Sequence, residues 1–124
     1  MNTSIFIIQL LLILLFTSGG LFKLTLPYAR FTKMPFQAWS NDFKPGHIRL
    51  IGLFEAAAAI GMLVPLVWHS LSILTPLVAV GMALVMAGAM STHLRRAEYP
   101  NMVGNLLWLG LALLFAYSRL IEFL

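Results

Sequence analysis

The sequence predicts an all-α fold, an integral-membrane four-helix bundle with one long interfacial loop between helices 1 and 2. Hydrophobic residues make up 60% of the 124 residues and charged residues only 10%, with a mean hydropathy of +0.92. In a soluble domain, about 25% of residues are charged. Most of the chain falls into four runs with almost no charge, each close to the roughly 20 residues that an α-helix needs to cross a bilayer. We therefore expect residues 1–124 to form a single four-span membrane domain.

The first span is predicted at residues 4–22, a run that carries no charged side chain and ends before Lys23. A secretory signal peptide would look similar. However, no positive segment precedes the run, and no small-x-small cleavage motif leads into a polar mature sequence. We expect this segment to remain in the protein as its first helix.

Residues 23–47 form the only long connection, and Pro27, Pro35 and Pro45 prevent one continuous helix there. Aromatic and basic side chains alternate along it, which is typical of a segment lying in the headgroup layer of a membrane. The same mixture occurs in nucleic-acid-binding segments, but the position beside two spans favours membrane lipid over nucleic acid as the partner. The residues concerned are Tyr28, Arg30, Phe31, Lys33, Phe36, Trp39, Phe43 and Lys44.

The other three spans are predicted at residues 48–67, 71–92 and 101–118. Thr75 followed by Pro76 is typical of an N-cap and a proline in the first helical turn, so the third helix either starts there or is kinked at the proline. A short turn joins the second and third spans, and a charged turn joins the third and fourth.

The distribution of basic residues predicts the orientation in the membrane. Of the eight Lys and Arg residues, only Arg119 lies on the side of the termini; the rest lie in or beside the two loops on the other side. Because basic loops stay in the cytoplasm, we expect loops 23–47 and 93–100 to be cytoplasmic and both termini to face outward. The expected location is a bacterial inner membrane.

Glu55 is the main chemical clue because it lies inside the second apolar run. A charged side chain there costs about 2.5 kcal/mol or more, so such residues usually face a bundle interior or a watery cavity. At 1.5 Å per residue, Glu55 lies roughly 10 Å from the loop side, where polar residues of the other three spans also gather. The sequence therefore predicts a ligand-binding cavity formed by Glu55, His93, Lys23, Asn105 and Trp108.

Small residues surround Glu55 on its helix face and allow another helix to approach closely. We expect helix packing through Gly19, Gly20, Gly52, Ala56 and Ala59. The alternative role for Glu55 is structural, either in an ion pair with Lys23, Arg49 or His93 or as a protonated carboxyl bonded to an asparagine. His93 also has an alternative, as a solvated histidine at a helix end.

Several kinds of site are excluded. The chain has no cysteine, which removes disulfides, thiolate ligands and cysteine nucleophiles. No histidine lies deep enough for haem, and no zinc-ligand cluster, Ser-His-Asp spacing, phosphate loop or dinucleotide fingerprint appears. We expect no catalytic residue, no metal and no intrinsic cofactor, so that electron transfer would need a bound quinone or a partner. The sequence does not decide whether the protein is an enzyme, but it favours a non-catalytic role.

Taken together, these residues resemble the DoxX-like family of small four-helix integral membrane proteins. The similarity rests on SGGLFKL at residues 18–24, GLFEAAAAIGMLVP at residues 52–65, the small-residue third span ending in His93, and LALLFAYSR at residues 111–119. The resemblance implies a membrane four-helix bundle and singles out Gly20, Lys23, Gly52, Glu55, Pro65 and His93. It also implies association with other proteins, because the family name comes from a subunit of a quinol-oxidising, sulfur-metabolising complex and other relatives are linked to chaperoning of membrane proteins.

The first functional hypothesis is an accessory or ligand-binding component of a membrane system, with a quinone-linked redox system as the specific case. One alternative is a small dimeric proton-coupled transporter that uses Glu55; small multidrug exporters carry their glutamate in the first helix, where this chain has no acid. A second alternative is a structural scaffold or chaperone for membrane proteins. The expected partners are membrane lipid, another membrane protein or redox subunit, and a second copy of the chain.

Overall fold

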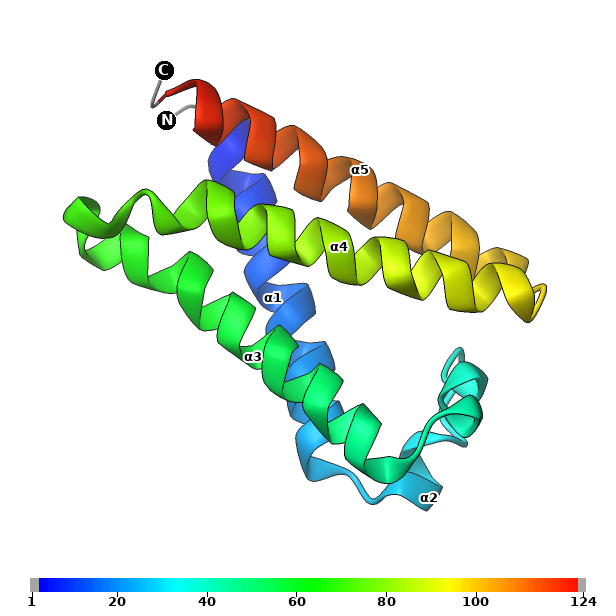
Figure 1. Cartoon of the computed structure of the whole chain (residues 1–124). Helices are drawn as coiled ribbons and strands as arrows, with labels where there is room; N and C mark the ends of the chain where they lie inside the picture. Colours follow the sequence, from blue (N-terminus) through cyan, green and yellow to red (C-terminus); the bar gives the residue numbers. More distant parts are fainter. Residues whose placement is uncertain (1–2, 123–124) are drawn as a thin grey trace.

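The structure, a computed structural model, describes residues 3–122 and is built almost entirely of helices (Figure 1). Four helices are each long and apolar enough to cross a membrane, and no strand occurs among the described residues. These helices are α1 (Thr3–Thr25), α3 (Pro45–Val67), α4 (Leu74–Arg95) and α5 (Tyr99–Ile121). The predicted all-α membrane architecture is confirmed.

Three short helices lie in the connections. They are α2 (Tyr28–Phe31) and the 3-10 helix η1 (Ala38–Asp42) between α1 and α3, and the 3-10 helix η2 (His69–Leu71) between α3 and α4. The long predicted loop is therefore a folded segment. The tyrosine hydroxyl of Tyr28 holds it together by donating to the carbonyl oxygens of Ser40, at 3.1 Å, and of Phe43, at 2.6 Å.

The helix ends differ from the predicted spans by about a turn. The first helix continues past residue 22 to Thr25, and the second begins at Pro45 rather than at residue 48. The third begins at Leu74 rather than at residue 71, which puts Pro76 in its first turn. Proline is tolerated in a first turn because the N–H that it lacks has no partner inside the helix. Because a helix can extend beyond the apolar run that crosses the bilayer, helix ends and span ends need not coincide, and the predicted spans stay predictions.

The long helices form two pairs, α1 with α3 and α4 with α5, which meet chiefly where α3 packs on α4 (Figure 1). We call the end of the bundle that carries residues 26–44 and the α4–α5 turn (residues 96–98) the loop end. At this end the two pairs diverge, and η1 lies between α3 and the α4–α5 turn (Figure 1). The opposite end carries η2.

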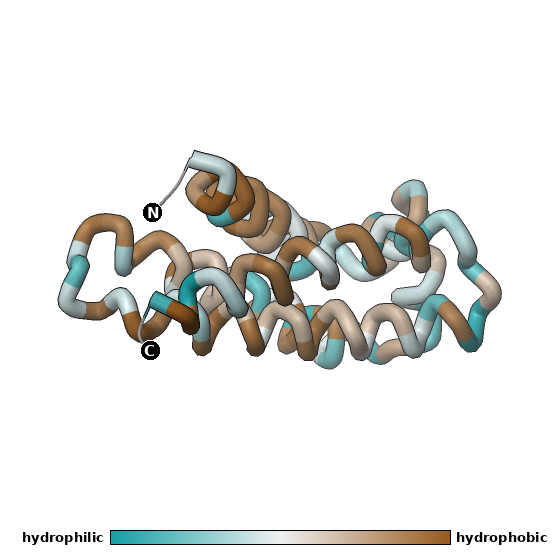
Figure 2. Tube along the Cα trace, turned by 90° about the horizontal axis from the view of Figure 1, so that it is seen from above, coloured by the Kyte–Doolittle hydropathy of each residue, from teal (hydrophilic) through white to brown (hydrophobic). Residues whose placement is uncertain are grey.

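The core between the pairs combines alanines and methionines with a few large side chains, of which Phe16 and Phe115 are the largest. It comprises Leu12, Phe16, Ala59, Met62, Ala79, Met82, Ala83, Met86, Ala112, Phe115 and Ala116. Alanines let helix backbones approach, and methionines fill the irregular space that remains. Many of the remaining large apolar side chains are exposed on the outer surface of the helices. The hydrophilic positions gather in the turns (Figure 2). This arrangement suits a bundle whose surrounding solvent is lipid.

The crossing of α1 and α3 positions the polar residues of the loop end. A Cβ atom at Gly20 would lie 2.9 Å from both the backbone nitrogen of Ala56 and the carbonyl oxygen of Gly52, so the two backbones are in contact there. Nearby, the guanidinium of Arg49 on α3 donates to the carbonyl oxygens of Lys23, at 3.0 Å, and of Leu24. These carbonyl groups belong to the last turn of α1 and therefore have no hydrogen-bond partner within the helix. The contact fixes Lys23 beside α3.

Candidate functional site

A cleft of about 780 Å³ lies at the loop end between the two helix pairs. All four long helices line it, together with residues of the 36–43 segment, and most of the lining is apolar. The size falls within the range of about 300–1,000 Å³ typical of small-molecule sites, which combine apolar walls with a few polar groups. The cleft brings together the five residues predicted as a ligand site: Lys23, Glu55, His93, Asn105 and Trp108.

An ion pair between Lys23 on α1 and Glu55 on α3 forms one wall of the cleft. Lys23 Nζ lies 2.8 Å from Glu55 Oε1, and only 11% and 8% of the two side chains are exposed. Of the partners considered for Glu55 from the sequence, the structure selects Lys23, because Arg49 binds the end of α1 and His93 binds another carboxylate. A paired lysine offsets part of the cost of burying the carboxylate.

Aromatic rings surround the lysine on the side of the loop. Lys23 Nζ lies 5.8 Å from the ring centroids of both Phe31 and Trp39, within the range of a cation–π contact. Trp39 also makes edge-to-face contacts with Phe31, Phe43 and His93 at centroid distances of 6.3, 5.6 and 6.2 Å. Trp39 therefore contacts side chains of the loop, of α1 and of α4. The sequence identified it as an interfacial aromatic residue but not as part of the cavity.

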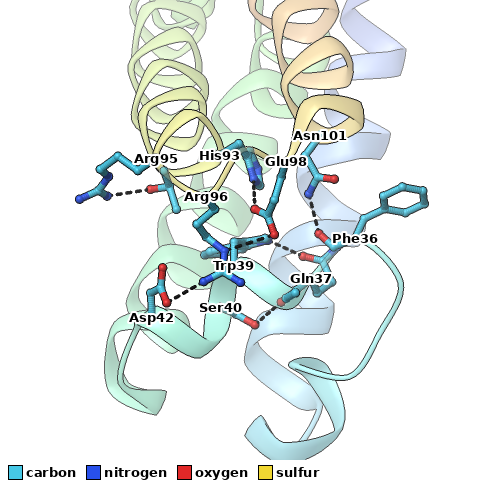
Figure 3. Close-up of polar contacts among 12 residues, drawn as sticks. Phe36, Gln37, Trp39, Ser40, Asp42, His93, Arg95, Arg96, Glu98 and Asn101 are labelled. Carbon is cyan, nitrogen blue, oxygen red and sulfur yellow. Dashed lines mark hydrogen bonds and ion pairs between the residues drawn. The ribbon is translucent and has the colours of Figure 1, made fainter.

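His93, at the end of α4, is 5% exposed, so the alternative of a solvated histidine is wrong. Its Nδ1 atom lies 2.9 Å from Glu98 Oε1 (Figure 3). An ionised carboxylate can only accept hydrogen bonds, so Nδ1 carries the hydrogen of this contact. Glu98 was missed from the sequence. Its position five residues after His93, across a tight turn, was the available signal.

Glu98 belongs to a charged chain that runs along the loop end (Figure 3). Arg96 contacts Glu98 Oε2 through Nε at 3.2 Å and Asp42 Oδ1 on η1 through Nη1 at 2.7 Å. Burial disfavours ionisation of the Glu98 carboxyl, but hydrogen bonds from His93 and Arg96 outweigh this effect and lower its pKa. Hydrogen bonds to Asp42 and Glu98 raise the pKa of Arg96, so the guanidinium stays charged.

The wall formed by α5 carries Asn105 and Trp108. The amide nitrogen of Asn105 is buried and has no hydrogen-bond partner among residues 3–122. An unpaired amide in an apolar environment is costly, so this donor favours any acceptor that enters the cleft. One helical turn earlier, Asn101 is already used, because its Nδ2 donates to the carbonyl oxygen of Phe36 at 2.8 Å (Figure 3).

The small residues predicted for helix packing have three different positions. Gly20, Gly52 and Ala56 lie at the close crossing of α1 and α3, and Ala59 is buried in the core. Gly19 instead faces the carboxylate of Glu55, and a Cβ atom there would collide with Glu55 Oε2. A side chain at this position would therefore displace the carboxylate from Lys23.

Two polar side chains near the opposite end are buried, which the sequence did not predict. Thr75 was predicted as an N-cap, but it lies inside the first turn of α4, whose N-cap is Ile73. Gln9 on α1 and Thr75 on α4 are fully buried, and Gln9 Nε2 donates to the carbonyl oxygen of Met62 at 2.9 Å. Gln9 Oε1 and Thr75 Oγ1 have no partner within the described part of the chain. Gln9 was recognisable as the only polar residue between residues 5 and 16. Neither side chain lines the cleft.

Comparison with known proteins gives one match. A family model described as the DoxX-like family matches residues 7–115, which is most of the chain and includes all the residues of the cleft. No curated protein and no solved structure matches the chain.

Proposed function

The chain belongs to the DoxX-like family, and we propose that it is an accessory, ligand-binding component of a membrane system. The proposed ligand is a lipophilic molecule that carries carbonyl oxygens, as a quinone does. The observation that carries the proposal is the buried, unpaired amide nitrogen of Asn105 in an otherwise largely apolar cleft. A donor without a partner needs an acceptor, and a carbonyl oxygen on an apolar ring supplies one without bringing a charge into the membrane.

The remaining groups of the cleft suit the same ligand. Trp39 and Trp108 offer flat aromatic surfaces against which a ring can stack, and they belong to the loop and to α5. The ammonium of Lys23 has further N–H groups beside the one directed at Glu55, and these can donate to a second oxygen. Glu55 would then accept or release a proton as the charge on the ligand changes. Electrons would come from a partner protein, because the sequence carries no cysteine, no histidine deep enough for haem and no dinucleotide fingerprint.

The tryptophans provide the test. Trp39 and Trp108 line the cleft, whereas Trp68, the third tryptophan of the chain, lies at the opposite end and can be replaced by Phe. In lipid nanodiscs, we expect decylubiquinone to quench the fluorescence of the Trp68→Phe protein saturably. Adding Asn105→Leu should weaken binding at least about tenfold, the equivalent of one buried hydrogen bond of about 1.4 kcal/mol.

The control is Leu107→Ala on the same helix, whose side chain is exposed to lipid and does not line the cleft. This variant should bind as the parent protein does. Quenching that rises linearly with quinone concentration, or that Asn105→Leu leaves unchanged, would contradict the proposal, because both results describe quinone dissolved in the bilayer.

For the orientation, we propose that the loop end faces the cytoplasm of a bacterial cell and that both termini face outward. The support is the concentration of basic residues at the loop end. Because the chain has no cysteine, single cysteines report the topology directly. In intact cells, a membrane-impermeant maleimide should label Ser70→Cys in η2 and should label Lys33→Cys only after permeabilisation; both positions are exposed. The reverse pattern would show that the orientation is inverted.

A further inference from the structure

The segment that closes the cleft at the loop end is joined covalently to the α1–α3 pair but only by non-covalent contacts to the α4–α5 pair. We call residues 32–44 the lid segment. Its Phe36, Trp39 and Phe43 line the cleft, so their side chains form the wall between the cleft and the water at the loop end. Both ends of the segment continue into the α1–α3 pair, through α2 on one side and directly into α3 on the other (Figure 1). The segment therefore belongs covalently to that pair alone.

Within residues 3–122, each hydrogen bond, ion pair or ring contact between the lid segment and the α4–α5 side involves at least one side chain. The contacts are the ion pair between Asp42 and Arg96, at 2.7 Å, the bond from Asn101 to the carbonyl oxygen of Phe36, at 2.8 Å, and the edge contact of Trp39 with His93 (Figure 3). No backbone–backbone hydrogen bond crosses between the two parts within residues 3–122. Side chains can exchange these bonds for water, so this attachment can open without unfolding any helix.

The Asp42–Arg96 contact is suited to breaking and reforming. The side chains are 52% and 27% exposed, and ion pairs in contact with water contribute little to stability. Arg96 is also held on its other side by Glu98, which in turn holds His93. The guanidinium therefore stays in place, charged and directed toward η1, when Asp42 leaves.

Backbone strain occurs once in the lid segment and once in the α4–α5 turn. Phe36 has a φ of 66° and Ala97 has a φ of 54°, and these are the two non-glycine residues with positive φ among those described. Side chains with a Cβ disfavour this region, and such strain persists only where surrounding contacts impose it. At Phe36, the bond from Asn101 to its carbonyl is such a contact. Detachment of the lid segment would allow Phe36 to relax, which offsets part of the cost of opening.

From these observations, we propose that residues 32–44 form a lid that opens the cleft to the aqueous side at the loop end, with Asp42–Arg96 as its latch and Trp39 as the side chain that blocks entry. The inference deepens the proposed ligand-binding function and rests on it only for the identity of the ligand. Opening would move the lid with the α1–α3 pair and leave His93, Asn105 and the rest of the α4–α5 wall in place.

The first test measures access to the cleft without any ligand. Ser18→Cys places a single thiol on α1 in the cleft lining, and Lys33→Cys places one outside it on the exposed surface of the lid segment. We expect Arg96→Met to raise the rate at which a water-soluble maleimide labels Ser18→Cys by about twofold to fivefold, as expected for the loss of an exposed ion pair, and to leave the labelling of Lys33→Cys unchanged. The control is Arg30→Met, which removes the same charge from an exposed residue of α2 that does not line the cleft. Arg96→Lys should restore part of the protection.

The second test closes the lid. In Asp42→Cys/Arg96→Cys on the Trp68→Phe background, a short bis-maleimide crosslinker joins the two positions. Decylubiquinone should then quench the fluorescence of the two remaining tryptophans, Trp39 and Trp108, at least about tenfold more slowly than in the same protein before crosslinking. Equal labelling of Ser18→Cys in the parent and Arg96→Met proteins, including no labelling in either, would overturn the lid. So would equal quenching rates before and after crosslinking. Absence of saturable quenching in the parent protein would instead contradict the proposed ligand, and the thiol rates would still decide whether the lid exists.

Discussion

We expect Lys23→Met to destabilise the folded protein by about 3–5 kcal/mol, the largest effect of any single change discussed for this chain. The substitution leaves Glu55 buried without the cation that lies 2.8 Å away. The carboxylate has no replacement nearby, because Arg49 is bound to the end of α1 and His93 is bound to Glu98. Unfolding in mixed detergent micelles, followed by circular dichroism, measures the change in the free energy of unfolding.

The informative comparison is the double variant Lys23→Met/Glu55→Met. Replacing a whole buried ion pair with apolar side chains is often neutral or even stabilising, so we expect the double variant to recover most of the stability lost in Lys23→Met. Glu122→Gln breaks the exposed contact with Arg119 and should cost no more than about 1 kcal/mol. A double variant as unstable as the single one would mean that the pair contributes packing rather than charge neutralisation. A stable double variant that has lost quinone quenching would assign the pair to the ligand.

The second large effect is expected at Gly20, where Gly20→Ala should cost about 1–3 kcal/mol. The new methyl group would lie 2.9 Å from two backbone atoms of α3, which cannot move aside as the end of a side chain can. The helices would have to separate, which would also move Lys23 away from Glu55. The same unfolding measurement reports the stability, and the quinone titration reports the loss of geometry in the cleft.

Gly81→Ala is the matched control, since it makes the same change in the middle of α4. A Cβ atom there meets no atom within 4 Å. Alanine is a better helix former than glycine, so this variant should be unchanged or slightly more stable. If Gly20→Ala were also neutral, α1 and α3 would not be in backbone contact in the membrane, and the position of Lys23 would need another explanation.

The candidate site was predictable in part because polar residues are easily recognised within the apolar runs of membrane helices. A carboxylate such as Glu55 stands out against an apolar run, and counting residues from the loops placed Lys23, His93 and Asn105 at a similar depth. The pairing was not predictable. Three cations were within reach of Glu55 by depth, and the choice of Lys23 depends on how closely α1 approaches α3 and on the use of Arg49 at the helix end.

The loop was harder to interpret. Its composition predicted an interfacial segment rich in aromatic residues, but alternation of rings and cations does not say which ring faces which helix. Trp39 enters the cleft because Tyr28 holds the segment in a compact form and Asp42 and Phe36 are bound by α4 and α5 residues far along the chain. Glu98 was overlooked because it lies in a charged turn, where an acidic side chain is usually exposed to water.

By itself, the sequence determined that this protein is a membrane bundle of four helices with a carboxylate buried near its loop end. Those features depend on hydropathy and on local spacing. An apolar run in a bilayer must form a helix to pair its backbone groups, and the thickness of the hydrocarbon core sets the length of that helix. Only the tertiary structure decided where the helices end, which cation neutralises Glu55, that His93 is buried against Glu98, and that residues 32–44 close the cleft. These features depend on the distances between helices that are remote in sequence. In a lipid environment, small residues and a few polar side chains set these distances, and the hydrophobic pattern carries almost no information about them.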